Sequence, residues 1–330
     1  MPKKRILSGM RPTGKLHLGH LAGALNNWIK LQDEYDCFFM VADWHALMSE
    51  YENPENIQAN ILDNVVDWLS CGITPDKSVI FIQSQVPEHL ELFFIFSLIT
   101  PLGLLERCPT YKEQLREITN RNLSTYGFLG YPVLQAADIL LYKAAAVPVG
   151  EDQLPHLELT RQICRKFNHL YPVKKDAVFP EPKALLTETP RLTGLDGRKM
   201  SKSYNNFIAL SEEPEIIRKK IQNMFTDPER IRLTDPGHPH KCNVFSYYSV
   251  FFPEMKGEAQ KRCSKSEIGC TDCKKELAGK IIGLLAPIQE KRRALLKDTK
   301  HIQDILSAGK AKASSVASKT IAEVKELLKI

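Results

Sequence analysis

The chain has 330 residues, of which 43% are hydrophobic and 25% charged, a composition typical of a globular protein with a buried core. No apolar run approaches the roughly 18 residues of a membrane-spanning helix, and the apolar stretch of the opening MPKKRILSGM is too short for a signal peptide. We therefore expect a cytoplasmic protein of about two domains with no membrane partner.

The net charge of +6 is unevenly distributed along the chain. Residues 1–205 contain 22 Lys and Arg against 23 Asp and Glu, whereas residues 206–330 contain 23 against 16. A polyanion such as nucleic acid would meet the C-terminal part first, although a solvated helical surface explains the same surplus equally well.

Strand-like and helix-like segments alternate over the first 90 residues. The apolar runs RILSG, CFFMVADWHAL and SVIFIQS have strand character, and residues 20–32 and 56–72 have helical periodicity, the second segment ending at Gly72 as a C-cap. This alternation predicts an α/β fold, with a parallel sheet covered by helices on both faces. Ligands of such sheets bind at the carboxyl ends of the strands.

The remaining chain is expected to be mainly helical. Residues 88–170 are interrupted by YPVLQAADILLY and by the apolar AAAVPVGEDQ, and the proline-bearing 171–190 is expected to cross the surface. Residues after 205 predict helices with a polar, proline- and cysteine-bearing interruption at 234–273, and an amphipathic helix at the end. We expect one domain over 1–205 and a second, helical domain over 206–330.

The segment PTGKLHLGH, residues 12–20, follows the first predicted strand. His17 and His20 lie on one face if a helix begins here, and the N-terminus of a helix attracts anions. Gly14 and Gly19 allow a phosphate or a ring to approach the backbone closely. Alone, a histidine pair at this spacing is more often an ordinary loop feature.

A second segment, GRKMSKS, covers residues 197–203. Lys199 and Lys202 can place compact positive charges on a phosphate chain, beside the hydroxyls of Ser201 and Ser203. Alone, this segment is more often a solvated basic loop.

The two segments together are far more specific. PxxxxHxGH near the start and KMSKS about 180 residues later form the signature pair of class I aminoacyl-tRNA synthetases. With SGMRPTGKLHLGHL, VADWHAL, YPVLQAADILLY and VPVGEDQ, nearly the whole chain resembles the bacterial tryptophanyl-tRNA synthetase family. The resemblance implies a Rossmann-type catalytic domain that ends in the KMSKS loop, a helical anticodon-binding domain, and a homodimer.

The resemblance also implies a reaction. The carboxylate of L-tryptophan attacks the α-phosphate of ATP, pyrophosphate leaves, and the tryptophanyl group passes to the terminal adenosine of tRNA(Trp). The implied catalytic residues, which act with Mg²⁺, are His17, His20, Lys199 and Lys202. The implied ATP contacts are Arg11, Pro12, Thr13, Gly19, His20, Gly150, Glu151, Asp152, Arg191, Lys199, Met200, Ser201, Lys202 and Ser203.

Asp138 matches the residue that accepts the indole N–H of tryptophan. The implied wall of the pocket comprises Tyr131, Gln135, Val147, Val149, Gln153, Leu7, Ser8 and Gly9. At Gln135 many relatives have methionine, and Leu7 replaces an aromatic residue of several relatives.

Three other functions are consistent with parts of this pattern. The spacing YxxxQxxD at 131–138 also resembles the pocket of tyrosyl-tRNA synthetases, although VPVGEDQ and the full opening motif favour tryptophan. A catalytically silent RNA-binding paralogue would not need the His17–His20 and lysine pairs. An unrelated nucleotidylyltransferase would share HxGH and the sheet, but not the tryptophan-pocket residues or the basic, cysteine-bearing C-terminal part.

Eight cysteines fall into two groups. Four are scattered among apolar neighbours and are expected in the core, whereas Cys242, Cys263, Cys270 and Cys273 have the spacing C-x20-C-x6-C-x2-C. Four thiolates suit either tetrahedral Zn²⁺ or an iron–sulfur cluster, and the spacing does not distinguish the two. The match around IGCTDCKK implies the family subset with a [4Fe-4S] cluster in the anticodon-binding region, and therefore favours the cluster over Zn²⁺.

Overall fold

The central element is a five-stranded parallel sheet with the strand order β3-β2-β1-β4-β5. The structure is a computed structural model that describes residues 3–117, 122–173, 177–186, 192–198, 200 and 204–330. The strands are β1 (Arg5–Met10), β2 (Asp36–Val41), β3 (Ser78–Ile82), β4 (Ala146–Val149) and β5 (Lys183–Leu186). The predicted α/β class is confirmed, and the sequence order of the strands reverses between β1 and β4.

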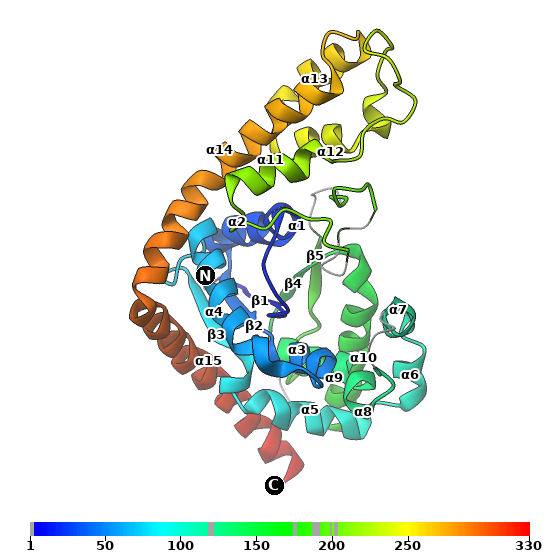
Figure 1. The fold of residues 1–330 in the computed structure, drawn as a ribbon. Coiled ribbons are helices and arrows are strands. Elements are labelled where there is room, and N and C mark those ends of the chain that lie inside the picture. Colours follow the sequence, from blue (N-terminus) through cyan, green and yellow to red (C-terminus); the bar gives the residue numbers. More distant parts are fainter. Residues whose placement is uncertain (1–2, 118–121, 174–176, 187–191, 199, 201–203) are drawn as a thin grey trace.

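Both faces of the sheet are apolar. Successive side chains of a strand point to opposite sides, so an unbroken apolar run places apolar side chains on each face. On β2, Cys37, Phe39 and Val41 belong to one buried cluster, whereas Phe38 and Met40 belong to the other. The sheet is therefore a layer between two cores, with helices over each face (Figure 1).

The first face is covered by the helices that follow β1 and precede β3. They run through α1 (Leu18–His20), a π-helical segment η1 (Leu21–Leu25), α2 (Asn26–Glu34) and, after α3 (Asp43–Glu50) and η2 (Pro54–Asn56), α4 (Ile57–Cys71). Trp28 of α2 stacks on Phe39 at 4.4 Å between ring centroids and meets the edge of Trp68 on α4 at 5.1 Å. Helix α4 ends at Gly72, which adopts φ 119°, as the sequence predicted.

The second face is covered by helices between β3 and β5 and by the last helix. Their bounds are η3 (Gln83–Gln85), α5 (Glu88–Ile99), α6 (Leu102–Glu106), α7 (Pro109–Glu117), α8 (Tyr126–Leu129), α9 (Tyr131–Leu141), η4 (Glu151–Gln153) and α10 (Leu154–Leu170). Their core contains Phe96, Phe167 and Phe179, whose rings meet edge to face.

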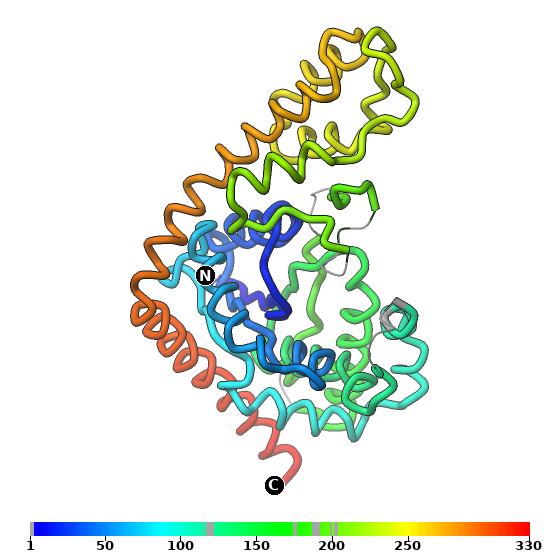
Figure 2. The backbone as a smooth tube through the Cα atoms, viewed as in Figure 1, coloured from blue at the N-terminus to red at the C-terminus, as the bar shows by residue number. Residues whose placement is uncertain are grey.

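The C-terminal elements form an arm that then returns to the sheet (Figures 1 and 2). The arm contains α11 (Pro214–Gln222), η5 (Pro239–Lys241), α12 (Asn243–Phe251), η6 (Pro253–Met255), α13 (Lys256–Ser264) and the start of α14 (Cys270–Lys297). Helix α15 (Thr299–Leu328) packs against β3 and α5. In the tube view the chain can be followed from the tip of the arm along α14 to α15 beside the sheet (Figure 2).

Four expectations from the sequence differ from the structure. YPVLQAADILLY, expected to interrupt the helical region, forms helix α9 (Tyr131–Leu141). The apolar run CFFMVADWHAL is a strand only to Val41, and α3 begins at Asp43, whose Oδ1 accepts the N–H of Ser84 at 2.9 Å. Within the proline-bearing segment, Lys183–Leu186 forms the edge strand β5 instead of crossing the surface, because it pairs with β4. The polar segment 234–273 contains α12 and α13.

None of the helices in the described ranges is long and apolar enough to cross a membrane.

Candidate active site

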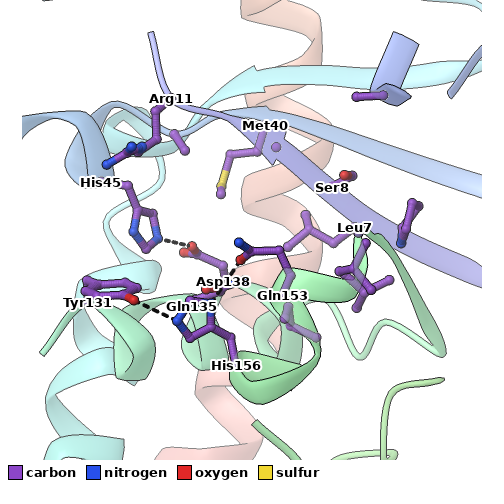
Figure 3. A pocket seen from close by; sticks show the side chains of 18 of the residues that line it. Leu7, Ser8, Arg11, Met40, His45, Tyr131, Gln135, Asp138, Gln153 and His156 are labelled. Atoms are coloured by element: carbon purple, nitrogen blue, oxygen red, sulfur yellow. Dashed lines mark hydrogen bonds and ion pairs between the residues drawn. The ribbon is translucent and has the colours of Figure 1, made fainter. Parts of the chain in front are cut away.

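A cavity of about 460 Å³ lies where the order of the strands reverses, at the carboxyl ends of β1 and β4 (Figure 3). Parallel sheets bind ligands at such a point because two neighbouring loops diverge there and leave a crevice. The cavity is lined by all nine residues expected around tryptophan: Leu7, Ser8, Gly9, Tyr131, Gln135, Asp138, Val147, Val149 and Gln153.

Helix α9 supplies the polar side of this cavity. Tyr131, Gln135 and Asp138 are four and three residues apart, so they share one face of the helix. Pro132 near the first turn suits a helix start, since its missing N–H would have no partner within the helix. The residues therefore reach the cavity from one rigid element, as Figure 3 shows.

Asp138 is buried and accepts three hydrogen bonds. Its Oδ2 accepts from His45 Nε2 at 2.8 Å, and its Oδ1 accepts from His89 Nδ1 at 2.6 Å and from Gln83 Nε2 at 2.8 Å. Burial alone would raise the pKa of Asp138, but the hydrogen bonds from His45 and His89 outweigh it and lower the pKa to about 2. The group is thus an ionised acceptor on the polar side of the cavity.

A second buried layer fixes the orientation of Asp138. His89 Nε2 lies 2.9 Å from the hydroxyl of Tyr142. Because Nδ1–H donates to the carboxylate, a neutral His89 accepts the Tyr142 hydrogen at Nε2. Burial raises the pKa of Tyr142 well above its usual value, so its hydroxyl remains a donor.

His156 holds two further residues of the cavity wall. The Tyr131 hydroxyl lies 2.7 Å from His156 Nε2, and His156 Nδ1 lies 2.9 Å from Gln153 Oε1. Burial lowers the pKa of His156 to about 4, so the ring is neutral near pH 7. A neutral ring with its hydrogen on Nδ1 donates to Gln153 and accepts from Tyr131.

The histidine pair lies at the start of the helix that follows β1. His17 precedes α1, and its Nδ1 accepts the Gly19 N–H at 3.2 Å, while His20 Nδ1 accepts the His17 N–H at 3.2 Å. The two ring centroids are 3.8 Å apart. Because each Nδ1 accepts a backbone hydrogen, a neutral ring at either position carries its own hydrogen on Nε2, where it is a donor suited to phosphate oxygens.

The expected ATP contacts are only partly within the described residues. Arg11 and Gly150 line the cavity, and Glu151 and Asp152 begin η4 beyond β4. Met200 lies beside the histidine pair, since a Cβ added to Gly19 would lie 3.0 Å from its sulfur. Pro12 and Thr13 belong to the loop between β1 and α1. Residues Arg191, Lys199, Ser201, Lys202 and Ser203 lie outside the described residues.

Five residues of this network were not singled out from the sequence: His45, Gln83, His89, Tyr142 and His156. His45 and Gln83 follow the carboxyl ends of β2 and β3, so a rule based on strand ends could have found them. His89, Tyr142 and His156 lie inside helices or at a helix end, and their roles depend on tertiary contacts.

The four grouped cysteines converge from three helices of the arm. Cys242 precedes α12, Cys263 lies in α13, and Cys270 and Cys273 lie in the first turn of α14. Burial, then the neighbouring Cys242 and Cys263, with smaller contributions from Glu276 and Cys270, raise the pKa of Cys273 to about 12. The four thiols are therefore electrostatic neighbours.

The backbone at Gly237 approaches one of these cysteines closely. A Cβ added to Gly237 would lie 2.4 Å from Cys263 Sγ, so this backbone approach requires glycine. In the described part of the chain, no three of the four sulfur atoms lie within 4.8 Å of one another.

A tighter group of metal-ligand atoms lies beside the cysteines. Asp227, Glu229 and His238 bring their ligand atoms within 4.8 Å of one another. Asp227 already accepts hydrogen bonds from the His238 N–H at 2.7 Å and from His238 Nδ1 at 2.9 Å, and Glu229 pairs with Lys241. These interactions satisfy the carboxylates within the protein, as expected for a structural loop.

The chain is similar to known proteins over nearly its whole length. Residues 2–286 match the family model of class I tRNA synthetases for tryptophan and tyrosine (W and Y). The tryptophan–tRNA ligase of Thermotoga maritima is 51% identical, with 99% of each chain covered, and that of Aquifex aeolicus is 43% identical over 99% of this chain and 100% of its own. The crystal structure of tryptophanyl-tRNA synthetase from Campylobacter jejuni complexed with ADP and tryptophan aligns with a TM-score of 0.88 at 34% identity, covering 99% of this chain and 100% of that one. The chain therefore belongs to the class I aminoacyl-tRNA synthetase family of the tryptophan and tyrosine enzymes.

Proposed function

We propose that the chain is a tryptophan–tRNA ligase, which activates L-tryptophan with ATP and transfers it to tRNA(Trp). Curated relatives with this activity match it at 40% to 51% identity over nearly the full length. The observation that carries the residue assignments is the ionised Asp138 in a cavity that also has an apolar wall and lies beside the helix that follows HxGH.

The cavity has the chemistry that an indole ring requires. Asp138 is the proposed acceptor of the indole N–H, because a carboxylate oxygen can accept more than one hydrogen bond. Leu7, Val147 and Val149 offer apolar wall to the ring. Phenylalanine would leave the buried carboxylate unmatched, which is costly, whereas tyrosine brings its own donor and is the competing substrate. The remaining proposed contacts are Ser8, Gly9, Tyr131, Gln135 and Gln153.

The ATP site is proposed to lie over the loop between β1 and α1. The reaction needs no covalent enzyme intermediate, so the protein positions the tryptophan carboxylate against the α-phosphate and stabilises charge on the phosphates. His17 and His20 would donate from Nε2, and Lys199 and Lys202 would add positive charge. Mg²⁺ would supply further positive charge at the phosphates when bound with ATP. The proposed supporting contacts are Arg11, Pro12, Thr13, Gly19, Gly150, Glu151, Asp152, Arg191, Met200, Ser201 and Ser203.

ATP–pyrophosphate exchange with each standard amino acid tests this function on the full chain. Exchange that depends on tryptophan alone is the expected result. Exchange with tyrosine would reassign the pocket while leaving the ATP site in place. Absence of exchange with any amino acid would indicate a silent RNA-binding paralogue.

We propose that Cys242, Cys263, Cys270 and Cys273 hold a [4Fe-4S] cluster, with Zn²⁺ as the alternative. Their electrostatic proximity supports a shared bound group, and the resemblance around IGCTDCKK favours the cluster over Zn²⁺. A cluster would hold the starts of α12 and α14 and the end of α13 together in a polar part of the arm. Its role here is structural, and no electron transfer is required.

Metal analysis of anaerobically purified protein decides between the two groups. The cluster predicts about four iron and four sulfide per chain and broad visible absorption, whereas zinc predicts about one metal per chain and no visible band. Cys270→Ser should weaken tRNA charging and leave ATP–pyrophosphate exchange intact. Equal loss of both reactions would contradict the proposed separation of roles.

We propose that the C-terminal region binds the anticodon part of tRNA(Trp), with the catalytic unit over residues 1–205. The surplus of 23 Lys and Arg over 16 Asp and Glu in residues 206–330 supports a polyanion partner. Helix α15 is assigned to the catalytic unit as well, since it packs on β3 and α5. Charging of tRNA for translation supports a cytoplasmic location.

We propose a homodimer that buries an apolar face of α5. The sequence of α5 is strongly apolar after Glu91, which is typical of a helix with little solvent exposure. Leu92, Ile95 and Phe96 pack inside the protein, but Phe94 is 62% and Leu98 70% exposed. Leu102 of α6 and Tyr126 of α8 add exposed apolar area. A second copy of the chain is the proposed cover.

A further inference from the structure

The histidine segment, residues 16–20, is held from one side by a short strand-like segment, residues 208–210, that precedes α11. Leu18 N–H donates to Ile208 O at 3.0 Å, and Leu210 N–H donates to Leu16 O at 3.0 Å, with His17 opposite Ala209 in an antiparallel bridge. The position of the histidine pair thus depends on residues 208–210, which follow the lysine loop closely in the sequence.

Helix α14 fixes that strand-like segment with one side chain. The amide of Gln289 donates to Leu210 O at 3.0 Å and to Glu212 O at 2.9 Å. Glu212 in turn accepts from the Ala209 N–H at 2.9 Å and from Lys220 at 2.7 Å. Removal of the Gln289 amide would leave two carbonyls without this donor and loosen the segment against His17.

One turn further along the same helix, Arg292 reaches the other side of the histidine segment. Arg292 forms an ion pair with Asp63 and lies 3.4 Å from Asp67 Oδ1, both on α4. The Leu16 backbone N–H faces the same Asp67 carboxylate, although neither Asp67 oxygen meets the geometry of a full hydrogen bond in the described part of the chain. Asp67 is fully buried, so its position depends on these charged and polar neighbours.

We propose that Gln289 and Arg292 are positioning residues for ATP binding, which hold the Leu16–Leu18 backbone between segment 208–212 and α4. They are three residues apart and share one face of α14, so a single rigid helix sets both contacts. Figure 1 shows α14 leaving the arm and passing along the catalytic unit toward α15. This inference rests on the proposed ATP-dependent function.

Steady-state exchange kinetics of the full chain test the proposal. Gln289→Met removes the amide at similar length, and Arg292→Lys keeps the charge but loses the planar fork that faces two carboxylates. Each should lower kcat/KM for ATP about tenfold, because small displacements of a positioning contact have large effects on rate, while KM for tryptophan stays within about twofold. Arg293→Met, at the exposed neighbour on α14, is the matched control and should change neither.

Two results would overturn the proposal. Equal changes of the ATP and tryptophan parameters would indicate general destabilisation, and unchanged ATP parameters would show that the contacts do not position the segment. Amide hydrogen exchange separates this test from the proposed activity. Faster exchange at Leu18 and Leu210 in Gln289→Met is expected whether or not the wild type has exchange activity, and unchanged rates there would also refute the proposal.

Discussion

Asp138 combines two properties that rarely coexist, complete burial and a full negative charge. Three donors from α3, η3 and α5 make this possible, and all three come from outside the helix that carries it. The residue therefore remains an acceptor near neutral pH, since its pKa is lowered to about 2. A substrate that brings an N–H to this point meets a prearranged partner.

Replacing this acceptor should affect tryptophan far more than ATP. Asp138→Asn is expected to lower kcat/KM for tryptophan about a hundredfold, because the charge-assisted hydrogen bond is lost and one amide N–H must find a new partner. KM for ATP, measured in the same exchange assay, should stay within about twofold and serves as the internal control. A loss of the same size for both substrates would count against a specific role in tryptophan recognition.

Asp67 shows the opposite shift and should make stability depend on pH. Burial and Asp63 raise its pKa, Arg292, the Leu16 amide and Lys15 lower it, and the result is about 7. Because the folded state then holds a proton that the unfolded state has released, stability is greatest below about pH 4 for this group and is lost as pH rises through about 7. A shift of about three units corresponds to about 4 kcal/mol.

Urea unfolding between pH 5 and 8 measures this contribution. In Asp67→Asn the fall in the free energy of unfolding across this range should largely disappear. Asp304→Asn on the exposed face of α15 is the control and should keep the wild-type slope. If Asp67→Asn retains the full slope, another group is responsible for it.

The residues that sequence reasoning could reach are those in direct contact with the cavity. The motif match supplied Asp138, Tyr131 and Gln135, but the segment that holds them was expected to interrupt the helices, so their shared face on α9 was found only in the structure. It could not supply His89 and Tyr142, which act on Asp138 from behind. Their pairing joins residues 53 positions apart and exists only after α5 packs on α9.

At the level of elements, the strands of the first 90 residues were predicted and the later two were not. The runs at β2 and β3 are almost wholly buried and that at β1 is partly buried, whereas the buried β4 is short and contains Pro148, and β5 has partly exposed residues and prolines before it. An edge strand is defined by its partner, here β4, more than by its own composition. The start of α3 was likewise hidden in an apolar run.

Helix α15 approaches the sheet so closely that only glycine fits at one position. A Cβ at Gly309 would lie 1.8 Å from the Ile80 carbonyl oxygen on β3. Gly309→Ala should therefore separate the helix from the strand and destabilise the protein by about 3 kcal/mol, measured by urea unfolding.

Two other helical glycines provide the matched control. A Cβ at Gly279 or Gly283 of α14 would meet nothing within 4 Å. Alanine at either position should raise stability by about 0.5–1 kcal/mol, because it restricts the unfolded chain. If all three substitutions destabilise the protein, the contact with Ile80 is not the cause of the effect of Gly309→Ala.

At the scale of the whole molecule, the exposed face of α5 predicts association. The double variant Phe94→Glu, Leu98→Glu should shift the protein from about twice to once the chain mass of 37.5 kDa in light scattering after size exclusion. Ile231→Glu, at an apolar residue that is 87% exposed on the arm, should leave the mass unchanged. A wild type that is monomeric at micromolar concentration would refute the dimer.

The division into two units was predicted from charge and motif position. These features of the sequence do not indicate against which unit each C-terminal helix packs. The arm and α15 are both helical and both follow residue 205, yet α15 covers the sheet. Its buried Ile302 and Ile305 belong to the core of one face of the sheet, and Ala313, Ala317 and Ile321 belong to the core of the other face. Only the contacts of a helix reveal which part of the molecule it covers.

The close packing of α15 on β3 has a consequence for synthesis on the ribosome. Strands β1 to β3 are complete after residue 82, but part of their cover is translated roughly 240 residues later. At about 5–20 residues per second, this delay is on the order of 10–50 s. During that time a nascent chain carries an uncovered apolar strand face, so the growing polypeptide is the form of this protein most exposed to aggregation and most dependent on chaperones.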